Sequence, residues 1–360
     1  ARPVSPHCIG QGGLPGFGHL MLSGNKMMKA FVFKHYGRSA RPEFTDLPQP
    51  TMGPDEILVK VHAVGLNPID NMIPQGTFKP LLKFELPAVL GSDLAGVVVE
   101  VGSRVTRFRP GDAVYASLFD LGRGALAQWT VVPEHAAALK PASLDFVQAA
   151  SIPMVALTAW QAFTEQAPLA PGQRVFIPAG SGGIGSFAIQ LAKHLGALVA
   201  TSTSTANAEW VGQLGAEVVV DYKRQAFDAL LQGYDLVLGT LRGDAIERSL
   251  SILQPGGRVL SLVGPPDAAF ARARNMNVIM TALFGLMSWK IHRLARRRGV
   301  TYGMMFVRPD GAQLTRIAAL LDEGKLRPVI DKVFPFEQVG EVLAYLATGR
   351  AKGKVVVSLA

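Results

Sequence analysis

Residues 174–193 have the sequence Arg174-Val-Phe-Ile-Pro-Ala-Gly-Ser-Gly-Gly-Ile-Gly-Ser-Phe-Ala-Ile-Gln-Leu-Ala-Lys193. The apolar run 175–177 predicts a short buried strand, and the spacing of apolar residues in 186–195 predicts a helix. Between them Gly180, Gly182 and Gly185 form the pattern G-x-G-x-x-G. A glycine triplet that follows a strand and opens a helix has the context of a dinucleotide-binding turn. We therefore expect a dinucleotide site here.

The glycines matter for a physical reason. Glycine allows the tight turn, lets the backbone approach a pyrophosphate, and lets the helix pack closely on the strand. The N-terminus of the helix then offers unpaired N–H groups and the positive end of its dipole to the phosphates.

Length and composition limit the fold and the compartment. The chain has 360 residues, 49% apolar and 18% charged, which predicts two domains that each bury a core. The single cysteine, Cys8, excludes an intrachain disulfide framework and a cysteine-based zinc cluster. It suits a reducing compartment, and we expect a cytoplasmic protein.

Positive charge is concentrated in one segment. The net charge is +9, and between Asp267 and Asp310 there are eight basic residues and no acidic one. The basic residues are Arg272, Arg274, Lys290, Arg293, Arg296, Arg297, Arg298 and Arg308. An evenly basic nucleic-acid binder would look different, so no nucleic-acid partner is expected. The longest apolar run, 278–289, is about half of the roughly 20 residues that span a membrane.

The first part of the chain predicts strands. Residues 1–27 contain no Asp or Glu and are rich in Gly and Pro, so we expect a leader or an added segment, with the natural start at Met28. From there to about residue 150, β-rich runs separated by Gly, Pro and Asp predict an all-β domain of the partly open barrel kind. The predicted strands are 30–33, 56–63, 95–101, 113–116 and 129–132.

The second part alternates. Residues 142–163 have a helical pattern that Pro153 interrupts, and the domain crossover is expected there. Strands are predicted at 175–177, 198–201, 217–220, 236–238 and 258–263, and helices at 186–195, 206–214 and 246–253. Such alternation predicts an α/β fold with a doubly wound parallel sheet. Helices at 314–321 and 336–347 and a strand at 354–359 close the chain.

Several motifs match one family in order along nearly all of residues 28–360. They include Val64-Gly-Leu-Asn-Pro-Ile-Asp70, Gly91-Ser-Asp-Leu-Ala-Gly96, Pro110-Gly-Asp-Ala-Val114, Leu157-Thr-Ala-Trp160, Leu253-Gln-Pro-Gly-Gly257 and Lys352-Gly-Lys-Val355. With the glycine turn, this set resembles the medium-chain dehydrogenase/reductase superfamily, in its zinc-free NADPH:quinone oxidoreductase (zeta-crystallin-like) branch. The resemblance implies a GroES-like, partly open β-barrel substrate domain from residues 28–152 and 308–360. It implies a Rossmann NADPH-binding domain from residues 153–307.

The residues at the expected metal position argue against zinc. Zinc-dependent relatives carry a Cys-His pair where Asn67-Pro68 stands, and a His-Glu pair where Ser92-Asp93 stands. Asparagine, proline and serine are poor zinc ligands, so we expect no metal site. An alkoxide would then lack the Lewis acid that stabilises it. Hydride transfer to an electron-poor acceptor, such as a quinone or a conjugated enone, is the easier chemistry.

The second strand of the alternating part indicates which nicotinamide cofactor is used. NAD-binding folds end this strand with Asp or Glu, which bonds the ribose 2′-hydroxyl. Here it ends with hydroxyl side chains, among them Ser202 and Thr203, which can donate to a 2′-phosphate. Tyr222, followed by Lys and Arg, resembles the family's second contact on the adenosine side. We expect NADPH, although Asn207 stands where relatives often have Lys.

Other cofactor contacts follow from the resemblance. Thr158 is expected by the nicotinamide and Lys354 near the cofactor; a helix-capping hydroxyl and an edge-strand lysine are the alternatives. The remaining expected contacts are Gly182, Gly183 and Ile184 at the pyrophosphate, Val263 and Gly264 under the nicotinamide ribose, and Phe306 and Val307 at the carboxamide.

Asn67 is the expected catalytic-site residue. Its amide can orient the nicotinamide or hydrogen-bond a substrate carbonyl; the alternative is a turn-forming Asn before Pro68. Asp70 is expected to stabilise this turn. The side chains expected to wall the substrate pocket, each of which could equally be core, are Met72, Ile73, Phe78 and Phe119. Relatives often carry Tyr and Arg at Met72 and Pro74, so we expect water to supply the proton and positioning to do most of the catalysis.

Three functions stay open from the sequence. The first is an NADPH-dependent, zinc-independent quinone reductase, the second a reductase of α,β-unsaturated aldehydes or ketones, and the third a non-enzymatic NADPH-binding protein. We expect a homodimer. The basic segment is interpreted first as the solvated end of a helix near the dimer edge. A peripheral membrane contact through residues 278–298, or an RNA or anionic-protein contact, is the alternative.

Overall fold

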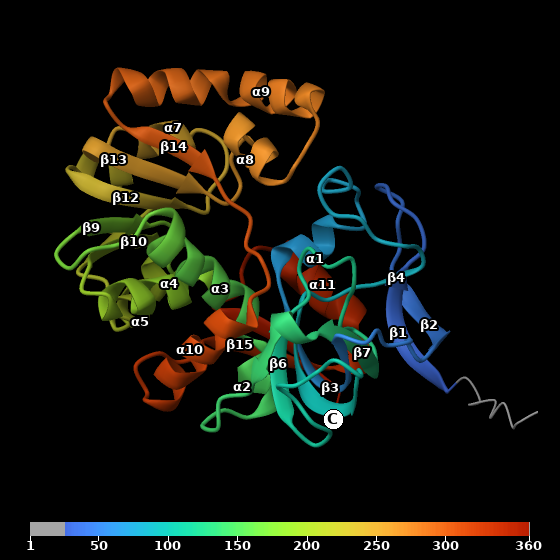
Figure 1. The fold of residues 1–360 in the computed structure, drawn as a ribbon. Coiled ribbons are helices and arrows are strands. Elements are labelled where there is room, and N and C mark those ends of the chain that lie inside the picture. The colour runs from blue at the N-terminus through green and yellow to red at the C-terminus, as the bar shows by residue number, and fades with distance from the viewer. Residues whose placement is uncertain (1–25, 360) are drawn as a thin grey trace, which may run out of the picture.

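A six-stranded sheet forms one half of the molecule. The computed structural model describes residues 26–359 (Figure 1). The sheet has the order β11-β10-β9-β12-β13-β14, and all neighbouring strands are parallel. This is the doubly wound order, in which the first strand lies inside the sheet and its βα turn faces the ligand crevice. The strands are β9 (Arg174–Ile177), β10 (Leu198–Thr203), β11 (Val218–Asp221), β12 (Tyr234–Gly239), β13 (Leu253–Ser261) and β14 (Thr301–Met304).

The helices of this half connect successive strands, as the alternation predicts. They are α4 (Gly183–His194), α5 (Ala208–Gly212), α6 (Phe227–Leu230), α7 (Ala245–Ser249), α8 (Ala268–Ala273) and α9 (Val278–Arg297). The expected α/β fold with a parallel sheet is confirmed.

A seven-stranded, largely antiparallel sheet forms the other half, where the GroES-like domain is expected. Its order is β15-β16-β3-β5-β6-β8, and β7 pairs with β3. The strands are β3 (Glu56–Leu66), β5 (Asp93–Val101), β6 (Ala113–Ser117), β7 (Trp129–Pro133), β8 (Ala137–Leu139), β15 (Ile330–Pro335) and β16 (Lys354–Ser358). A smaller sheet combines β1 (Met27–Phe33), β2 (Glu43–Pro48) and β4 (Ala88–Val89).

The helices beside this sheet include the segment that links the halves. They are α1 (Pro68–Met72), α2 (Phe146–Ala150), α3 (Pro153–Gln161), α10 (Gly311–Asp322) and α11 (Val339–Ala347). One contiguous apolar core runs through both halves and includes Leu94, Leu157 and Ile189. The domain boundaries at 152/153 and 307/308 stay a prediction, and residues 1–25 of the expected leader lie outside the described residues.

Strand register places three distant segments together. In the antiparallel pair β3–β5, Gly65 lies opposite Asp93, and in the antiparallel pair β16–β3, Leu66 lies opposite Val355. The residue after β3, Asn67, is therefore next to both Asp93 and Lys354. Gly182 also forms an isolated bridge with Gly353, so the start of β16 touches the glycine turn of the other half.

Several predicted elements have different bounds in the structure, and two of them have a clear physical reason. The helix expected from residue 186 begins at Gly183. Its first turn contains Gly183 and Gly185, which have no apolar side chain for the pattern to reveal. The helix expected over 246–253 ends at Ser249, and Leu253 already belongs to β13. Buried apolar residues in a short run fit a strand and a helix equally well.

Candidate active site

The glycine turn has the geometry of a phosphate cradle. It connects β9 to α4, and Gly182 caps α4 in an extended conformation with no side-chain hydrogen bond. A Cβ on Gly180 would collide with the Thr201 hydroxyl, and a Cβ on Gly185 would collide with the Ala179 carbonyl. The turn therefore requires these glycines, and the first N–H groups of α4 stay available to an anion.

The end of β10 lies beside this turn. The N–H of Gly180 donates to the Ser202 carbonyl over 2.9 Å. Thr203 is buried, and its hydroxyl is one of two buried side-chain polar atoms in residues 26–359 without a hydrogen-bond partner. An unpaired buried hydroxyl at the end of the second strand fits a site that a nucleotide completes.

The neighbouring strand brings charge to the same edge. Asp221 lies opposite Thr203 in the β10–β11 pair, and it accepts a hydrogen bond of 2.5 Å from the Thr205 hydroxyl. That hydrogen bond, with the N–H of Lys223 and the charge of Arg224, lowers the pKa of Asp221. Tyr222 is 62% exposed, so its side chain does not join the buried part of the site.

A buried polar cluster forms where β3, β5 and β16 meet. Lys354 Nζ donates to Asn67 Oδ1 over 2.6 Å and contacts Asp93 Oδ2 at 3.2 Å. Asn67 Nδ2 also donates to Asp93 Oδ2, over 2.9 Å. The relative exposures are 4% for Asn67, 0% for Asp93 and 5% for Lys354. Because β16 lies between β15 and β3, the alternative of an edge-strand lysine is wrong.

The cluster is tied to the glycine turn and to α3. A Cβ on Gly183 would lie 2.9 Å from Cδ of Lys354, so the lysine side chain passes directly along the turn. The second carboxylate oxygen of Asp93 accepts the Met154 N–H over 3.0 Å at the start of α3. In the same helix, the Thr158 hydroxyl donates to the Met154 carbonyl over 2.6 Å. The structure thus brings Asn67, Lys354 and the glycines together.

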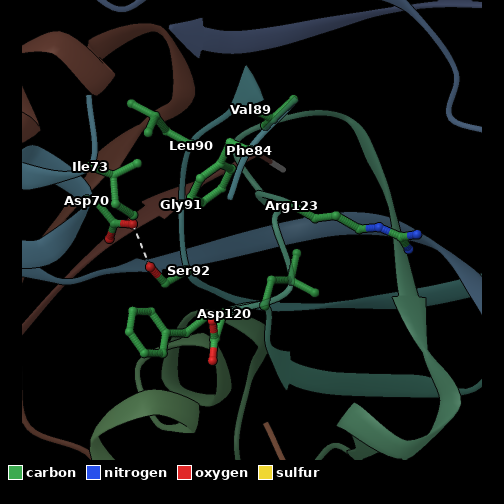
Figure 2. Close-up of a pocket in the computed structure, with 11 residues that line it drawn as sticks. Asp70, Ile73, Phe84, Val89, Leu90, Gly91, Ser92, Asp120 and Arg123 are labelled. Carbon is green, nitrogen blue, oxygen red and sulfur yellow. Dashed lines mark hydrogen bonds between the residues drawn. The ribbon is translucent and has the colours of Figure 1, made fainter. Parts of the chain in front are cut away.

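A second carboxylate supports the turn of Asn67. Asp70 accepts the Asn67 N–H over 2.7 Å and the Ser92 hydroxyl over 2.6 Å. Figure 2 shows Asp70 and Ser92, joined by their hydrogen bond, beside a small cavity that Ile73 also lines. The cavity has a volume of about 10 Å³, room for about one water molecule, and Phe119 also lines it. Asp70 stabilises the turn, as the sequence predicts.

Burial changes the pKa of both acids. Burial raises the pKa of Asp70 to about 6, against the opposing effects of the Ser92 hydroxyl and the Asn67 N–H. Burial also raises the pKa of Asp93, and the Lys354 ammonium opposes this most strongly. Desolvation penalises the charged carboxylate, whereas a nearby cation favours it.

Aromatic side chains fill the boundary between the halves. Phe306, which follows β14, contacts Phe119 with ring centroids 5.6 Å apart and Phe78 at 5.9 Å. Phe270 of α8 packs on Phe306 at 5.2 Å. Arg274, at the end of α8, forms a bidentate pair with Asp120 across the same boundary, at 2.7 and 2.8 Å.

The remaining predicted residues lie at several separate places in the structure. The Arg242 guanidinium lies 3.7 Å from the sulfur of Met72. Ile73 lines the small cavity. The N–H groups of Val263 and Gly264 turn toward the Ser261 hydroxyl, at 3.3 and 2.7 Å. Val307 is buried in the core. The predicted contacts of all these residues with cofactor or substrate stay predictions.

Sequence reasoning did not assign a role to Asp93, Phe270 or Arg274. The sequence identifies Asp93 only as the residue that stands where zinc-dependent relatives carry the Glu of a His-Glu pair. A signal existed, because strands 56–63 and 95–101 were predicted in succession, and their antiparallel pairing brings the start of the second opposite the end of the first. Nothing comparable marks the Arg274–Asp120 pair, whose partners are 154 residues apart.

Known proteins of similar sequence and fold indicate one family. The alcohol dehydrogenase GroES-like domain matches residues 53–142, and the zinc-binding dehydrogenase domain matches residues 214–357. A mitochondrial NAD(P)H oxidoreductase of Danio rerio is 36% identical over 357 residues, covering 92% of each chain. A chloroplastic NADPH-dependent alkenal/one oxidoreductase of Arabidopsis thaliana is 33% identical, covering 92% of this chain and 80% of its own. The quinone oxidoreductase structure from Coxiella burnetii superposes with a TM-score of 0.79 at 29% identity, covering 93% of this chain and 100% of its own.

This chain belongs to the medium-chain dehydrogenase/reductase superfamily. Its place is in the zinc-free, quinone oxidoreductase-like branch. It is an oxidoreductase that uses a nicotinamide cofactor, and the glycine cradle with the unpaired Thr203 hydroxyl fits that group. In residues 26–359, no group of three or more His, Cys, Asp or Glu is placed to hold a metal ion. Asp93, which stands where zinc-dependent relatives carry a ligand, is paired with the ammonium of Lys354 at 3.2 Å.

Proposed function

We propose that this reductase transfers a hydride from NADPH to a quinone. The observation that carries the proposal is the buried cluster of Asn67, Asp93 and Lys354 directly beside the glycine turn. It places a fixed positive charge and an amide next to a nucleotide site, in surroundings that exclude water. Such preorganised donors stabilise a negative charge that develops on a substrate oxygen.

Counting donors shows what the cluster can offer a substrate. The ammonium of Lys354 has three N–H donors, and its contacts with Asn67 and Asp93 occupy two of them. The Asn67 amide has two N–H donors, and Asp93 occupies one. One donor of each group remains for a carbonyl oxygen of the acceptor. Asp93 holds both groups in place and is itself fixed by the Met154 N–H.

The reduced nicotinamide, when bound, supplies the hydride. Lys354 and Asn67 polarise the acceptor carbonyl and stabilise the oxygen as it gains negative charge. Water supplies the proton, and the small cavity beside Asp70 and Ser92 has room for about one molecule. Phe78, Phe119 and Phe306 offer the apolar surface on which a flat acceptor packs.

The end of β10 supports NADPH over NADH. Ser202 and Thr203 place hydroxyl groups where NAD-binding folds carry an acid. The carboxylate opposite them, Asp221, is already paired with Thr205 and lies 3.6 Å from Arg224. Lys223 and Arg224 are exposed at this edge and can meet a 2′-phosphate.

A reductase of α,β-unsaturated carbonyl compounds is the second candidate. The Arabidopsis relative is named for alkenals and alkenones. The same two donors would polarise the enone oxygen and so make the β-carbon electrophilic. The cluster therefore serves either acceptor class.

Steady-state kinetics test both the acceptor class and the choice of cofactor. The purified protein, with a chelator present, is given NADPH or NADH and either 9,10-phenanthrenequinone or an alkenal. We expect turnover of the quinone with NADPH, and Lys223→Gln should lower kcat/KM for NADPH about tenfold, while kcat/KM for NADH is unchanged. The exposed Lys325→Gln is the matched control. Turnover of the alkenal but not of the quinone would support the second candidate. Equal rates with NADH and NADPH would contradict the preference for NADPH. Loss of turnover when the chelator is added would contradict a zinc-independent reaction.

Assembly and compartment are proposed separately. We propose a homodimer, which light scattering of the purified protein tests. The cytoplasm is proposed from the cysteine content alone, and imaging of the tagged full chain tests it. Two of the relatives carry mitochondrial and chloroplastic in their names, so organelle markers belong in that experiment.

A further inference from the structure

The 20-residue helix α9 exposes an unusual amount of apolar surface. Its buried residues are Phe284, Ser288, Ile291 and Ala295. On the opposite face Val278 is 84% exposed, Ile279 77% and Leu286 74%. The large apolar side chains that α9 exposes are Val278, Ile279, Leu283, Leu286, Met287 and Trp289. Scattered exposed apolar residues are ordinary, but a continuous patch marks an interaction surface.

The same face becomes basic toward its C-terminal end. Ile279, Leu283, Leu286, Lys290, Arg293 and Arg297 follow one another at steps of three and four residues, which places them on one side of a helix. Lys290 is paired with Glu247 at 2.6 Å, and Arg293 lies over the Trp289 ring at 5.2 Å. Within residues 26–359, no ion pair neutralises Arg296, Arg297 or Arg298. We call the exposed side of residues 278–298 the α9 face.

The α9 face is accessible at the outside of the molecule. Figure 1 shows α9 along the top of its half, with α7 and β14 beneath it. The other half of the molecule lies below and to the right. The surface therefore meets solvent along the length of the helix. A solvated basic helix end, the first interpretation from the sequence, accounts for the arginines but leaves the exposed Val278, Ile279 and Leu286 without a reason.

We propose that the α9 face docks on the surface of an anionic lipid bilayer. A helix that lies in the interface buries apolar side chains among the headgroups and places Lys and Arg on the lipid phosphates. The α9 face has both parts in one stripe. In residues 26–359, no helix is long and apolar enough to cross a membrane, so the contact proposed is peripheral.

Charge favours a bilayer over a second copy of the chain. A two-fold contact presents the same surface on both sides, and no acid lies between Asp267 and Asp310 to meet the arginines of the other copy. Anionic lipids supply the missing negative charge. An RNA backbone would also supply it, but the exposed Val278, Ile279 and Leu286 would gain nothing there.

Docking would bring the active-site boundary near the lipid. On its inner side, α9 packs Phe284 against Phe270 at 6.3 Å, and Phe270 packs on Phe306 at 5.2 Å. A chain of aromatic contacts therefore joins the buried side of α9 to Phe306, which in turn contacts Phe78 and Phe119. This consequence rests on the proposed function, and it matters most for an apolar acceptor that is dissolved in the membrane.

Vesicle co-sedimentation of the full chain tests the proposal. We expect binding to vesicles that contain phosphatidylglycerol, no binding to pure phosphatidylcholine vesicles, and loss of binding as salt increases. The variants I279D/L286D and R296E/R297E should each weaken binding about tenfold or more. Leu230→Asp, exposed on α6, and the surface pair R316E/K325E are matched controls that should bind like the wild type.

Turnover and oligomeric state separate the possible failures. All variants should retain turnover of a water-soluble quinone, so a weak vesicle contact is distinguished from a wrong proposed function. Equal binding by R296E/R297E and R316E/K325E would overturn the proposal. A wild-type protein that ignores anionic vesicles, together with an I279D/L286D variant that dissociates in light scattering, would assign the α9 face to a second copy instead.

Discussion

The glycine turn and the Asn67–Asp93–Lys354 cluster lie side by side but are built in opposite ways. The turn is a contiguous segment whose backbone makes the site, and side chains would obstruct it at Gly180 and Gly185. The cluster takes its groups from three segments: Asn67 and Asp93 are 26 residues apart, and Lys354 lies 261 residues beyond Asp93. It exists only once the antiparallel pairs β3–β5 and β16–β3 have formed.

This difference sets how each region responds to change. A turn made of backbone tolerates most side-chain substitutions around it. It does not tolerate replacement of a glycine at a position where two main-chain segments approach closely. A cluster of buried charges has already lost the solvation of every member, so removing one partner leaves the others with an uncompensated burial penalty. The cluster should therefore be the more sensitive region, in stability as well as in rate.

Lys354→Met should produce the largest effect. It keeps the length of the side chain but removes the cation from the buried Asp93, and breaking a buried pair in this way costs about 3–5 kcal/mol of unfolding free energy. Urea denaturation measures the loss, and kcat with the quinone should fall as well. The neighbouring Lys352→Met, at an exposed position, should change neither quantity.

A double variant separates charge from packing. In K354M/D93N both charges are gone, so part of the stability lost in K354M should return. Activity should not return, because the carbonyl-polarising cation is absent. If K354M and K352M are equally stable, the buried pair does not hold the cluster together, and the contrast with the glycine turn fails.

The pH dependence of stability probes the same cluster. Burial raises the pKa of Asp70 from its usual 3.8 to about 6, so folding favours the protonated form. This contribution is present in full below pH 3.8 and is lost as the pH rises through 6. Relative to Asp70→Asn, the wild type should lose about 3 kcal/mol of unfolding free energy between about pH 4 and pH 7.

Denaturation curves across this pH range measure the difference. In the Asp70→Asn variant the new amide can still accept one of the two hydrogen bonds, and the Ser92 hydroxyl can turn to accept from its N–H. Asp46→Asn, at an exposed position, provides the reference curve for loss of a surface carboxylate. Parallel curves for the wild type and Asp70→Asn would show that Asp70 is as well solvated in the folded protein as in the unfolded chain.

The same contrast explains what the sequence predicts well. The parallel sheet and the glycine turn follow from local patterns: a strand, a glycine triplet and a helix within residues 174–195. Asn67 and Lys354 were identified by resemblance, and the structure brings them into contact. The partner that holds both, Asp93, was missed because its importance comes from strand register and complete burial.

Other features could not be predicted for the same reason. The 186–195 pattern placed the start of α4 too late, since Gly183 and Gly185 carry no apolar side chain. The Arg274–Asp120 pair depends on how the two halves pack together. The basic segment was visible as composition, but the exposure of Ile279 and Leu286 on the same face is a property of the folded molecule.

Gly185→Ala tests the backbone side of the contrast and should have the smallest effect on stability. The new Cβ would collide with the Ala179 carbonyl, and the strain should cost about 1–3 kcal/mol of unfolding free energy. The turn must shift to relieve the strain, so NADPH affinity, measured by fluorescence titration, should also fall. Gly340→Ala is the matched control, because a Cβ there meets nothing within 4 Å, and within α11 alanine should stabilise by up to about 1 kcal/mol. If Gly185→Ala matches that control in stability and in NADPH affinity, the close approach of the two main chains does not define the nucleotide site. The turn would then depend on side chains as much as the cluster does.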